Sequence, residues 1–403
     1  MLKLPNEIIA CIMELVLDIH AADLFVSTEH DVDPSYPAML SALLRVSRRI
    51  RGIALNTPTL WTIILMGFQG FPYGLFLERS RDVPLTVLWL ANGKYKDEET
   101  IWHHHRRWRC LIVTSANSFT RSCRFPGDSL AFPALEMLSI CAKESVIRLC
   151  SLSRMPVLKQ LKFDGLVKPS RLALLCEILA DCKVLRHLTL GIYDGMDPDA
   201  SYSNISLPSL FSFELRIQNN RHIWTGTVLH LFRAPNLRKL CISICTPFKA
   251  IPADNLFDNL KFGERVQSLE LCVSHARFPP FSIPFRSMAR QFPNVSELTI
   301  RCDISSTTEQ LRECQLPNLL HFLAFWESGE SGESDPLQEE DTWDNFVGNM
   351  CAFLENREMY FDEQGSGYVP LRLTIGNSTN YHEGFEEAVA DGLVILESCS
   401  STK

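Results

Sequence analysis

A short apolar motif recurs along most of the 403-residue chain, and this repetition constrains the fold more than any other feature. Each copy has an apolar residue, two spacers, a second apolar residue, one spacer and a third apolar residue. The first members recur every 23 to 29 residues, a period that indicates stacked supersecondary units. The ten copies are Leu85/Leu88/Leu90, Trp108/Leu111/Val113, Leu135/Leu138/Ile140, Leu158/Leu161/Phe163, Leu185/Leu188/Leu190, Leu210/Phe213/Leu215, Leu237/Leu240/Ile242, Val266/Leu269/Leu271, Val295/Leu298/Ile300 and Leu319/Phe322/Ala324.

The residues within and between the copies predict a strand and a helix or turn in each unit. The last two apolar positions alternate with a spacer, as they do in a half-buried strand. A proline stands two residues before six of the copies, where it can enter a strand without having to donate a backbone hydrogen bond. Two intervening stretches predict helices, one over 170–181 and one after the capping-box sequence at 306–309.

An α/β repeat of this kind resembles a leucine-rich-repeat solenoid, in which each unit buries its apolar face only against its neighbours. That family has an Asn or Cys five residues after the second motif position, and only Cys245 matches it. We therefore expect an irregular array without a continuous Asn ladder. The alternative is a single α/β domain whose strands happen to begin alike.

The motif stops after Ala324, and a strongly acidic segment follows. Residues 327–403 hold 3 basic and 17 acidic side chains, which gives −14 and leaves +6 for the rest of the chain, in agreement with the net charge of −8. The Gly/Ser/Glu-rich stretch 327–341 predicts a solvated acidic insertion. The repeat domain, expected over 83–403, should then continue with a helix over 342–356, a strand over 371–375 and a capping helix over 383–396.

The first 66 residues have no copy of the strand motif and predict a small helical domain. Apolar residues at helical spacing follow Pro5, and a second helix is expected from about 39 to 55. The sequence Thr57–Pro58 ends that helix, and the apolar residues after it should close the core, with Trp61 inside. Residues 67–82 are expected to form a linker to the repeats.

Three segments of this helical region resemble an F-box, in the form that many fungal proteins carry. They are LPNEII at 4–9, LRVSRRIR at 44–51 and TPTLW at 57–61. The resemblance covers about residues 2–65, with Ser47 and Ile50 where the family usually has Cys and Trp. It implies that the protein is the substrate-recognition subunit of a Skp-cullin-RING ubiquitin ligase, whose repeats bind an unknown protein target.

The resemblance also implies which residues bind the Skp-type adaptor. Apolar side chains of the first two helices would be buried against it. The alternative is a leucine-rich-repeat interaction scaffold without a ubiquitin-ligase role, in which the helical module only caps the array. The implied adaptor-binding residues are Leu4, Pro5, Glu7, Ile8, Ile12, Leu43 and Val46.

The tract His103–Arg109 is the most concentrated polar segment. Adjacent histidines on a strand point to opposite faces, and no Cys, Asp or Glu stands at ligand spacing beside them, so we expect a solvated loop rather than a metal site. Its arginines could instead bind nucleic acid, but the body of the chain is too weakly basic to favour this. Three helical arginines predict a solvated face or a contact with an acidic partner: Arg45, Arg48 and Arg49.

The chain has no nucleotide-binding or hydrolase motif and no Cys-x-x-Cys pair. We therefore expect no enzymatic activity, no cofactor and no metal. The 14 cysteines should be reduced and mostly small core fillers, as Cys176 on an apolar stripe and Cys241 and Cys245 beside a strand suggest. No targeting or membrane-spanning segment is evident, so the cytoplasm or nucleus is the expected location.

Overall fold

The structure is a computed structural model, and it divides into two compact units. The first comprises Met1–Leu166 and Glu177–Leu185, and the second comprises Val167–Cys176 and Arg186–Lys403, so the boundary passes through helix α8 (Pro169–Asp181). The residues that the structure describes are 4–26, 35–68, 71–89, 98–114, 130–140, 153–167, 169–193, 204–218, 227–245, 257, 260, 262–274, 285–302, 316–326, 336–366, 368–376 and 385–398.

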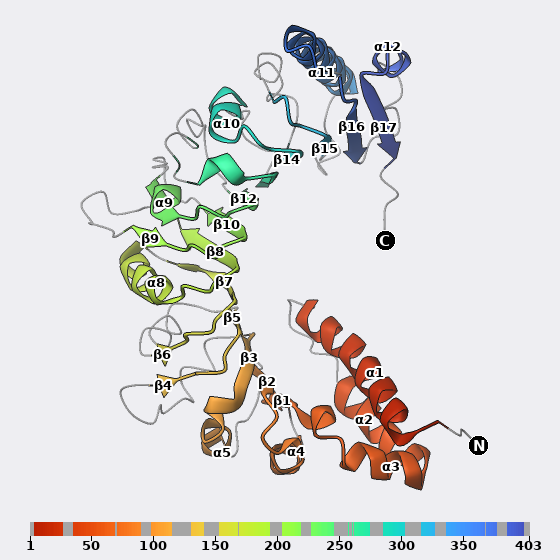
Figure 1. Cartoon of the computed structure of the whole chain (residues 1–403), viewed down its shortest axis with the longest axis vertical. Helices are drawn as coiled ribbons and strands as arrows, with labels where there is room; N and C mark the ends of the chain where they lie inside the picture. The colour runs from red at the N-terminus through yellow and green to blue at the C-terminus, as the bar shows by residue number, and fades with distance from the viewer. Residues whose placement is uncertain are drawn as a thin grey trace. The chain divides into compact units, whose positions relative to one another are not determined.

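A helical module opens the first unit (Figure 1). The helix predicted over 39–55 is in fact two helices that meet at Ser47. The Ser47 backbone is extended and its Oγ accepts a hydrogen bond from the Ile50 N–H at 3.1 Å, which caps the second of them. The elements of the module are α1 (Asn6–Val26), α2 (Ser35–Val46), α3 (Arg48–Leu55) and the 3-10 turn η1 (Pro58–Trp61).

Trp61 lies in the core of this module, as the sequence predicts. Its side chain is 1% exposed, and its Nε1 donates a hydrogen bond to the Ala54 carbonyl at 2.8 Å. Its ring meets the ring of Phe76 edge-on, with centroids 5.1 Å apart. The indole is therefore both packed and hydrogen-bonded, as a buried Trp needs to be. Other buried apolar residues of the module include Ile9, Met13, Leu40, Ile53 and Leu60.

The expectation that the first 66 residues form only helices is wrong for the last four of them. Residues Ile63–Met66 form strand β1, which pairs in parallel with β2 (Leu85–Trp89). All four residues of β1 are buried, and a strand covered on both faces has a continuous apolar sequence instead of an alternating one. The predicted linker over 67–82 contains a helix, α4 (Tyr73–Ser80), which buries Phe76 and Leu77.

Thirteen of the described strands form the main parallel array, five in the first unit and eight in the second, and four more form two short parallel pairs. Their order along the sheet is β1-β2-β3-β5-β7 in the first unit and β8-β10-β12-β13-β14-β15-β16-β17 in the second, so each strand joins the one before it. The chain therefore has an α/β fold in which parallel strands alternate with helices and turns. The further strands are β3 (Trp108–Val113), β5 (Met137–Ile140), β7 (Gln160–Val167), β8 (His187–Tyr193), β10 (Ser212–Gln218), β12 (Lys239–Cys245), β13 (Ser268–Ser274), β14 (Glu297–Cys302), β15 (His321–Trp326), β16 (Leu371–Gly376) and β17 (Val394–Ser398).

Backbone pairing keeps equivalent motif residues beside one another, and all ten predicted strands are confirmed. The second members of consecutive copies are register partners along both units. The first copy is the exception, because β2 and β3 shift by one residue after Leu85, so that Val87 rather than Leu88 faces Leu111. The matched rows are Leu111, Leu138 and Leu161 in the first unit, and Leu188, Phe213, Leu240, Leu269, Leu298 and Phe322 in the second.

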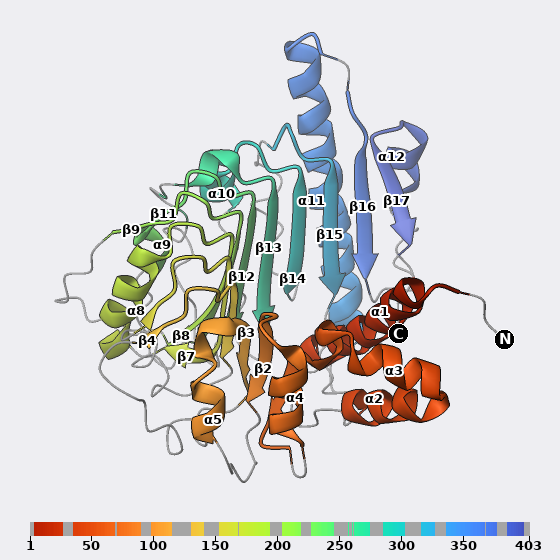
Figure 2. The ribbon, with the colours of Figure 1, turned by 60° about the horizontal axis from the view of Figure 1, so that its bottom comes forward.

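Helices and turns connect the strands, and in the second unit α9, α10 and α11 lie on one side of them (Figures 1 and 2). The predicted helix over 170–181 is confirmed as α8, whereas the capping box at 306–309 lies outside the described residues. The remaining connecting elements are α5 (Glu98–Trp102), η2 (His105–Arg107), α9 (Thr227–His230), η4 (Gly263–Arg265), α10 (Phe285–Gln291) and two short parallel pairs, β4 (Leu130–Ala131) with β6 (Ser153–Arg154) and β9 (Ile205–Ser206) with β11 (Phe232–Arg233).

The acidic C-terminal part is more regular than the sequence predicts. Helix α11 (Pro336–Glu363) includes the predicted helix over 342–356 and also the last six residues of the predicted insertion, while 327–335 lies outside the described residues. The predicted strand over 371–375 is confirmed as β16.

The capping helix predicted over 383–396 is wrong in its extent. The structure has a short helix, α12 (Glu386–Ala390), followed by strand β17, which pairs in parallel with β16. Gly392 has a φ of +72°, a conformation that a side chain would disfavour, and it lies between the helix and the strand. Val394 and Leu396 then continue the array beside Leu371 and Leu373.

Gly263 marks a close approach between neighbouring turns and gives a test of the packing. A Cβ at this position would lie 2.0 Å from the carbonyl oxygen of Gln291, whose Nε2 donates to the Leu260 carbonyl at 2.8 Å. We expect Gly263→Ala to lower the free energy of unfolding by about 1–3 kcal/mol, because backbone must move to admit the methyl group. Chemical denaturation with a circular-dichroism readout measures this.

The matched control is Gly348→Ala in α11, where a Cβ would meet nothing within 4 Å. That change should raise stability by up to about 1 kcal/mol, since alanine is the better helix former. Equal stability of Gly263→Ala and the wild type would contradict the close approach.

Candidate functional site

The implied adaptor-binding residues are mostly solvent-exposed in the helical module. The apolar side chains of Leu4, Ile8, Ile12 and Val46 are exposed by 36%, 46%, 48% and 63%. Pro5 and Glu7 are also exposed, and Leu43 is half-buried. Large apolar side chains usually lie inside, so several of them together on one small module indicate an interaction surface.

Helix α1 has two different apolar faces. Ile9 and Met13 are buried in the module, whereas Ile8, Ile12 and Leu15 point to solvent. Positions four and three residues apart lie on one side of a helix, so these three form one exposed stripe. The implied adaptor-binding residues do not include Leu15, although Leu15 is 63% exposed. The helical spacing of Leu15 from Ile12 could have added it to that set.

Arg49 ties the start of α1 to α3. Its Nε and Nη2 donate to the Asn6 Oδ1 at 3.1 and 2.9 Å, and Nη2 also donates to the Leu4 carbonyl. This bidentate contact orients Leu4 and the first turn of α1 relative to α3. All three helical arginines are exposed, as a solvated face requires, and Arg49 also has a partner within the chain.

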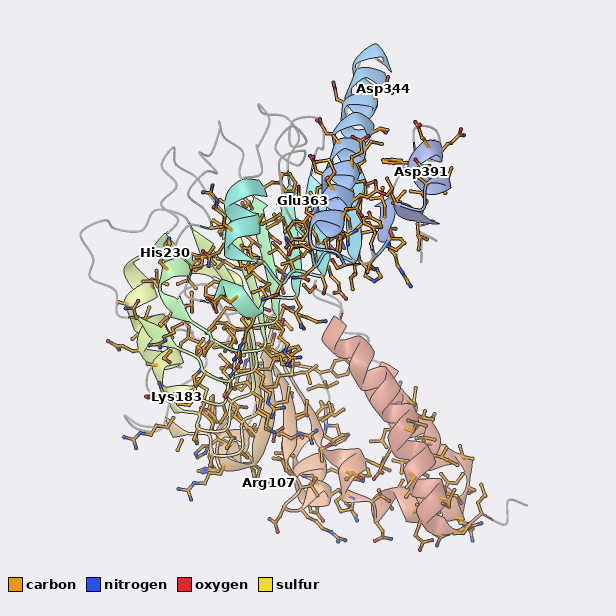
Figure 3. All side chains as sticks on the ribbon, turned by 45° about the horizontal axis from the view of Figure 1, so that its top comes forward. Arg107, Lys183, His230, Asp344, Glu363 and Asp391 are labelled. Atoms are coloured by element: carbon orange, nitrogen blue, oxygen red, sulfur yellow. The ribbon has the colours of Figure 1, made fainter. Side chains whose placement is uncertain are left out.

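The His103–Arg109 tract makes the turn before β3, and the strand begins at Trp108 as predicted. The tract is less solvated than expected. Arg107, labelled in Figure 3, donates to the Ser80 Oγ at 2.9 Å and to the Val83 carbonyl at 2.8 Å. A ring nitrogen of His105 lies 2.8 Å from the Trp102 carbonyl. These contacts give the tract a structural role in joining α4, α5 and β3.

His104 in this tract has a lowered pKa. Partial burial of the ring is the main cause, and the positive charge of Arg107 adds to it. A neutral His104 is consistent with packing inside the turn.

The strands of the second unit carry polar side chains on the face opposite their buried leucines. Successive residues of a strand point to opposite faces, so the spacer residues of the motif line this open face. Because the pairing is in register, they form two rows across five strands. The first row is Thr189, Glu214, Cys241, Glu270 and Thr299, and the second is Gly191, Arg216, Ser243, Cys272 and Arg301.

Charged residues of these rows pair with one another. Arg216 binds the Glu214 Oε1 through Nε at 2.8 Å and Nη2 at 2.7 Å. On the strands beyond, the Arg301 Nε lies 2.9 Å from the Glu270 Oε1. Both pairs are partly exposed, so each contributes little to stability.

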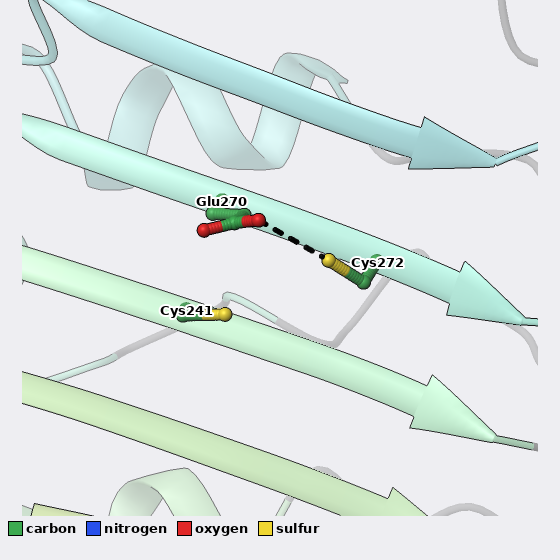
Figure 4. Close-up of side chains that lie close together, drawn as sticks. All are labelled: Cys241, Glu270 and Cys272. Atoms are coloured by element: carbon green, nitrogen blue, oxygen red, sulfur yellow. Dashed lines mark hydrogen bonds between the residues drawn. The ribbon is translucent and has the colours of Figure 1, made fainter. Parts of the chain in front are cut away.

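Cys241, Glu270 and Cys272 come together on the neighbouring strands β12 and β13 (Figure 4). Each offers one ligand atom, and the three atoms lie within 4.8 Å of one another. The Cys272 Sγ donates to the Glu270 Oε1 at 3.5 Å. All three side chains are half-buried, and in the described part of the chain this is the group of three potential metal ligands that the geometry brings together.

The pKa values of the Cys241 and Cys272 thiols shift in opposite directions from the ordinary value of a thiol. A hydrogen bond from Cys241 lowers the pKa of Cys272, with a smaller contribution from the Ser243 hydroxyl. The same hydrogen bond raises the pKa of Cys241, and burial and nearby carboxylates raise it further. Cys272 is therefore the more acidic thiol of the pair and Cys241 the less acidic one.

The expectation that most cysteines are core fillers holds for only some of those described. Cys110, Cys176 and Cys182 are buried, but Cys241, Cys272 and Cys351 are half-buried and Cys11 is exposed. The side chain of Cys245 lies outside the described ones. The signal that could have found the cluster is the spacer position shared by Cys241 and Glu270, which are 29 residues, one repeat, apart.

Comparison with family models found no match for the chain, and no curated protein is similar to it in sequence. Among the described residues, no helix combines the length and apolar character needed to cross a bilayer.

The thiol pair gives a prediction about reactivity in metal-free, reducing buffer. Cys272 should react with iodoacetamide faster than Cys351, another half-buried thiol whose pKa is raised by burial and by Glu355 and Glu387. The lowered pKa makes Cys272 thiolate at a lower pH, so its advantage should be largest near pH 7 and shrink as the pH rises. Timed alkylation with peptide mass mapping measures both rates; faster modification of Cys351 at pH 7 would contradict the assignment.

Proposed function

We propose that the protein is the substrate-recognition subunit of a Skp-cullin-RING ubiquitin ligase and that its helical module binds the Skp-type adaptor. The observation that carries this proposal is the exposed apolar surface of Leu4, Ile8, Ile12 and Val46 on a three-helix module. The F-box resemblance of the same segments implies that the partner is a Skp-type adaptor.

The energetics favour a partner on this surface. Burying one aliphatic side chain contributes up to about 1.5–3 kcal/mol, so a few such residues can dominate the affinity of an interface. Ile8 and Ile12 lie one helical turn apart and would act as neighbouring anchors, with Glu7 on the polar rim. The contact between Arg49 and Asn6 preorganises the surface, which lowers the entropic cost of binding.

In this proposal the open face of the repeats binds the protein target. Its rows present Glu214 paired with Arg216 and Glu270 paired with Arg301, a pattern that suits a polar partner of mixed charge. The chain itself would make or break no bond. It would hold the target near the ubiquitin-loaded enzyme and raise the effective concentration of the acceptor lysine.

A second candidate function is an interaction scaffold without a ligase role. The observation that favours it is that the helical module and strands β1 to β7 belong to one compact unit, as a solenoid cap would. Both functions accommodate this packing, and adaptor binding distinguishes them.

The test is the affinity of the full chain for a purified Skp-type adaptor, measured by calorimetry. The double change Ile8→Ala with Ile12→Ala should weaken binding at least tenfold, since each truncation removes an anchor worth more than about 1 kcal/mol. Both side chains are exposed, so the fold should be retained.

Ile395→Ala is the matched control, because Ile395 is 47% exposed, close to the 46% of Ile8, and lies in the second unit. It should leave the affinity unchanged. A wild-type chain that does not bind the adaptor, or a double variant that binds as tightly as the wild type, would reject the ligase role and leave the scaffold.

A further inference from the structure

We propose that Cys241, Cys272 and Glu270 form a binding site for a thiophilic divalent metal ion of the zinc class on the open face of the repeat strands. The site goes beyond the proposed ligase function and does not depend on it. Two sulfurs and one carboxylate oxygen are donors that Zn²⁺ takes in proteins, with a fourth position left open.

The strands place the three ligands before any metal binds. Cys241 on β12 is the register partner of Glu270 on β13, and Cys272 follows two residues later on the same face. Figure 4 shows the two sulfurs and the carboxylate on one face of the two neighbouring strands. Ligands on paired strands are held more rigidly than ligands on loops, which favours a defined geometry.

The separations are close to those of a tetrahedral site. Zinc–sulfur bonds of about 2.3 Å at tetrahedral angles put two sulfurs about 3.8 Å apart and a sulfur and an oxygen slightly closer. The Cys272 Sγ and the Glu270 Oε1 are already 3.5 Å apart, and all three ligand atoms lie within 4.8 Å. These separations therefore exceed the tetrahedral ones by at most about 1 Å.

The charges around the ligands also suit a divalent ion. Two thiolates and one carboxylate carry −3, and Arg301 bound to the Glu270 Oε1 offsets part of the excess. A carboxylate oxygen has two lone pairs, so the Glu270 Oε1 can accept from Arg301 and still bind the metal, as the hydrogen-bonded ligands of metal sites commonly do. The thiols select soft ions such as Zn²⁺ over Mg²⁺ or Ca²⁺.

The open face leaves the fourth position accessible. The side chain of Glu270 is 35% exposed and that of Arg301 46%, so water or a donor side chain of a bound protein can reach the ion. Ser243, the register partner of Cys272, is the neighbouring hydroxyl on β12.

The test uses the full chain purified in reducing buffer and titrated with Co²⁺, which reports thiolate coordination by charge-transfer absorption in the near ultraviolet. The expected result is one ion per chain with that absorption, and displacement by Zn²⁺. Cys241→Ser and Cys272→Ser should each lower the absorption and weaken Zn²⁺ binding tenfold or more, measured by competition with a chromophoric chelator.

Two further variants keep the outcome decisive. Glu270→Gln has almost the same shape but lacks the charge, so it should weaken Zn²⁺ binding about tenfold while retaining the wild-type circular-dichroism spectrum. Cys351→Ser is the control, since it removes a half-buried thiol on α11 and should change nothing. Binding without thiolate absorption, equal affinities for the wild type and the three site variants, or a Cys241–Cys272 disulfide that persists in the reducing buffer would each overturn the proposal.

Discussion

Parallel backbone pairing in register is the interaction on which the rest of this structure depends. Each strand has one face of leucines and related residues, and neither a strand nor its following helix can bury that face alone. Pairing sets Leu240 beside Phe213 and Leu269, and the same alignment continues through the second unit. A shift by one residue would turn every leucine to solvent, so burial itself enforces the register. Repetition of the same apolar spacing in each unit therefore specifies the whole array.

The same register decides the chemistry of the opposite face. Stacking the leucines inside requires the intervening spacers to stack outside, and this brings residues about one repeat apart in sequence into contact. Glu270 meets Arg301 and Cys241 in this way, and Cys272 lies two residues after Glu270 on the same strand. The core therefore acts as the scaffold of the polar rows, and changes at spacer positions can alter ligand binding at little cost to stability.

The helical module and the end of the array show where local patterns are sufficient and where they fail. The motif predicted ten strands correctly because alternation of apolar residues is a local property. It missed β1, whose residues are buried on both faces. It also missed β17, because the short helix before it ends at Ala390 and Gly392 then leads the chain into the strand. The break at Ser47 was also missed, since helical periodicity continues across a capping residue that begins a new helix. In each case the sequence pattern allowed two structures, and tertiary packing selected one of them.

The sequence by itself determined the period, the apolar face of each strand and the helical character of the first sixty residues. These properties follow from the spacing of side chains along one element. Only the tertiary structure decided which of two neighbouring isoleucines, Ile8 or Ile9, faces solvent, because the packing of α1 against its neighbours selects the buried stripe. It also decided that Cys241, Glu270 and Cys272 meet, because the contact depends on the pairing of two strands separated by a connection whose length varies from repeat to repeat. Distances between elements come from packing, and no single element encodes them.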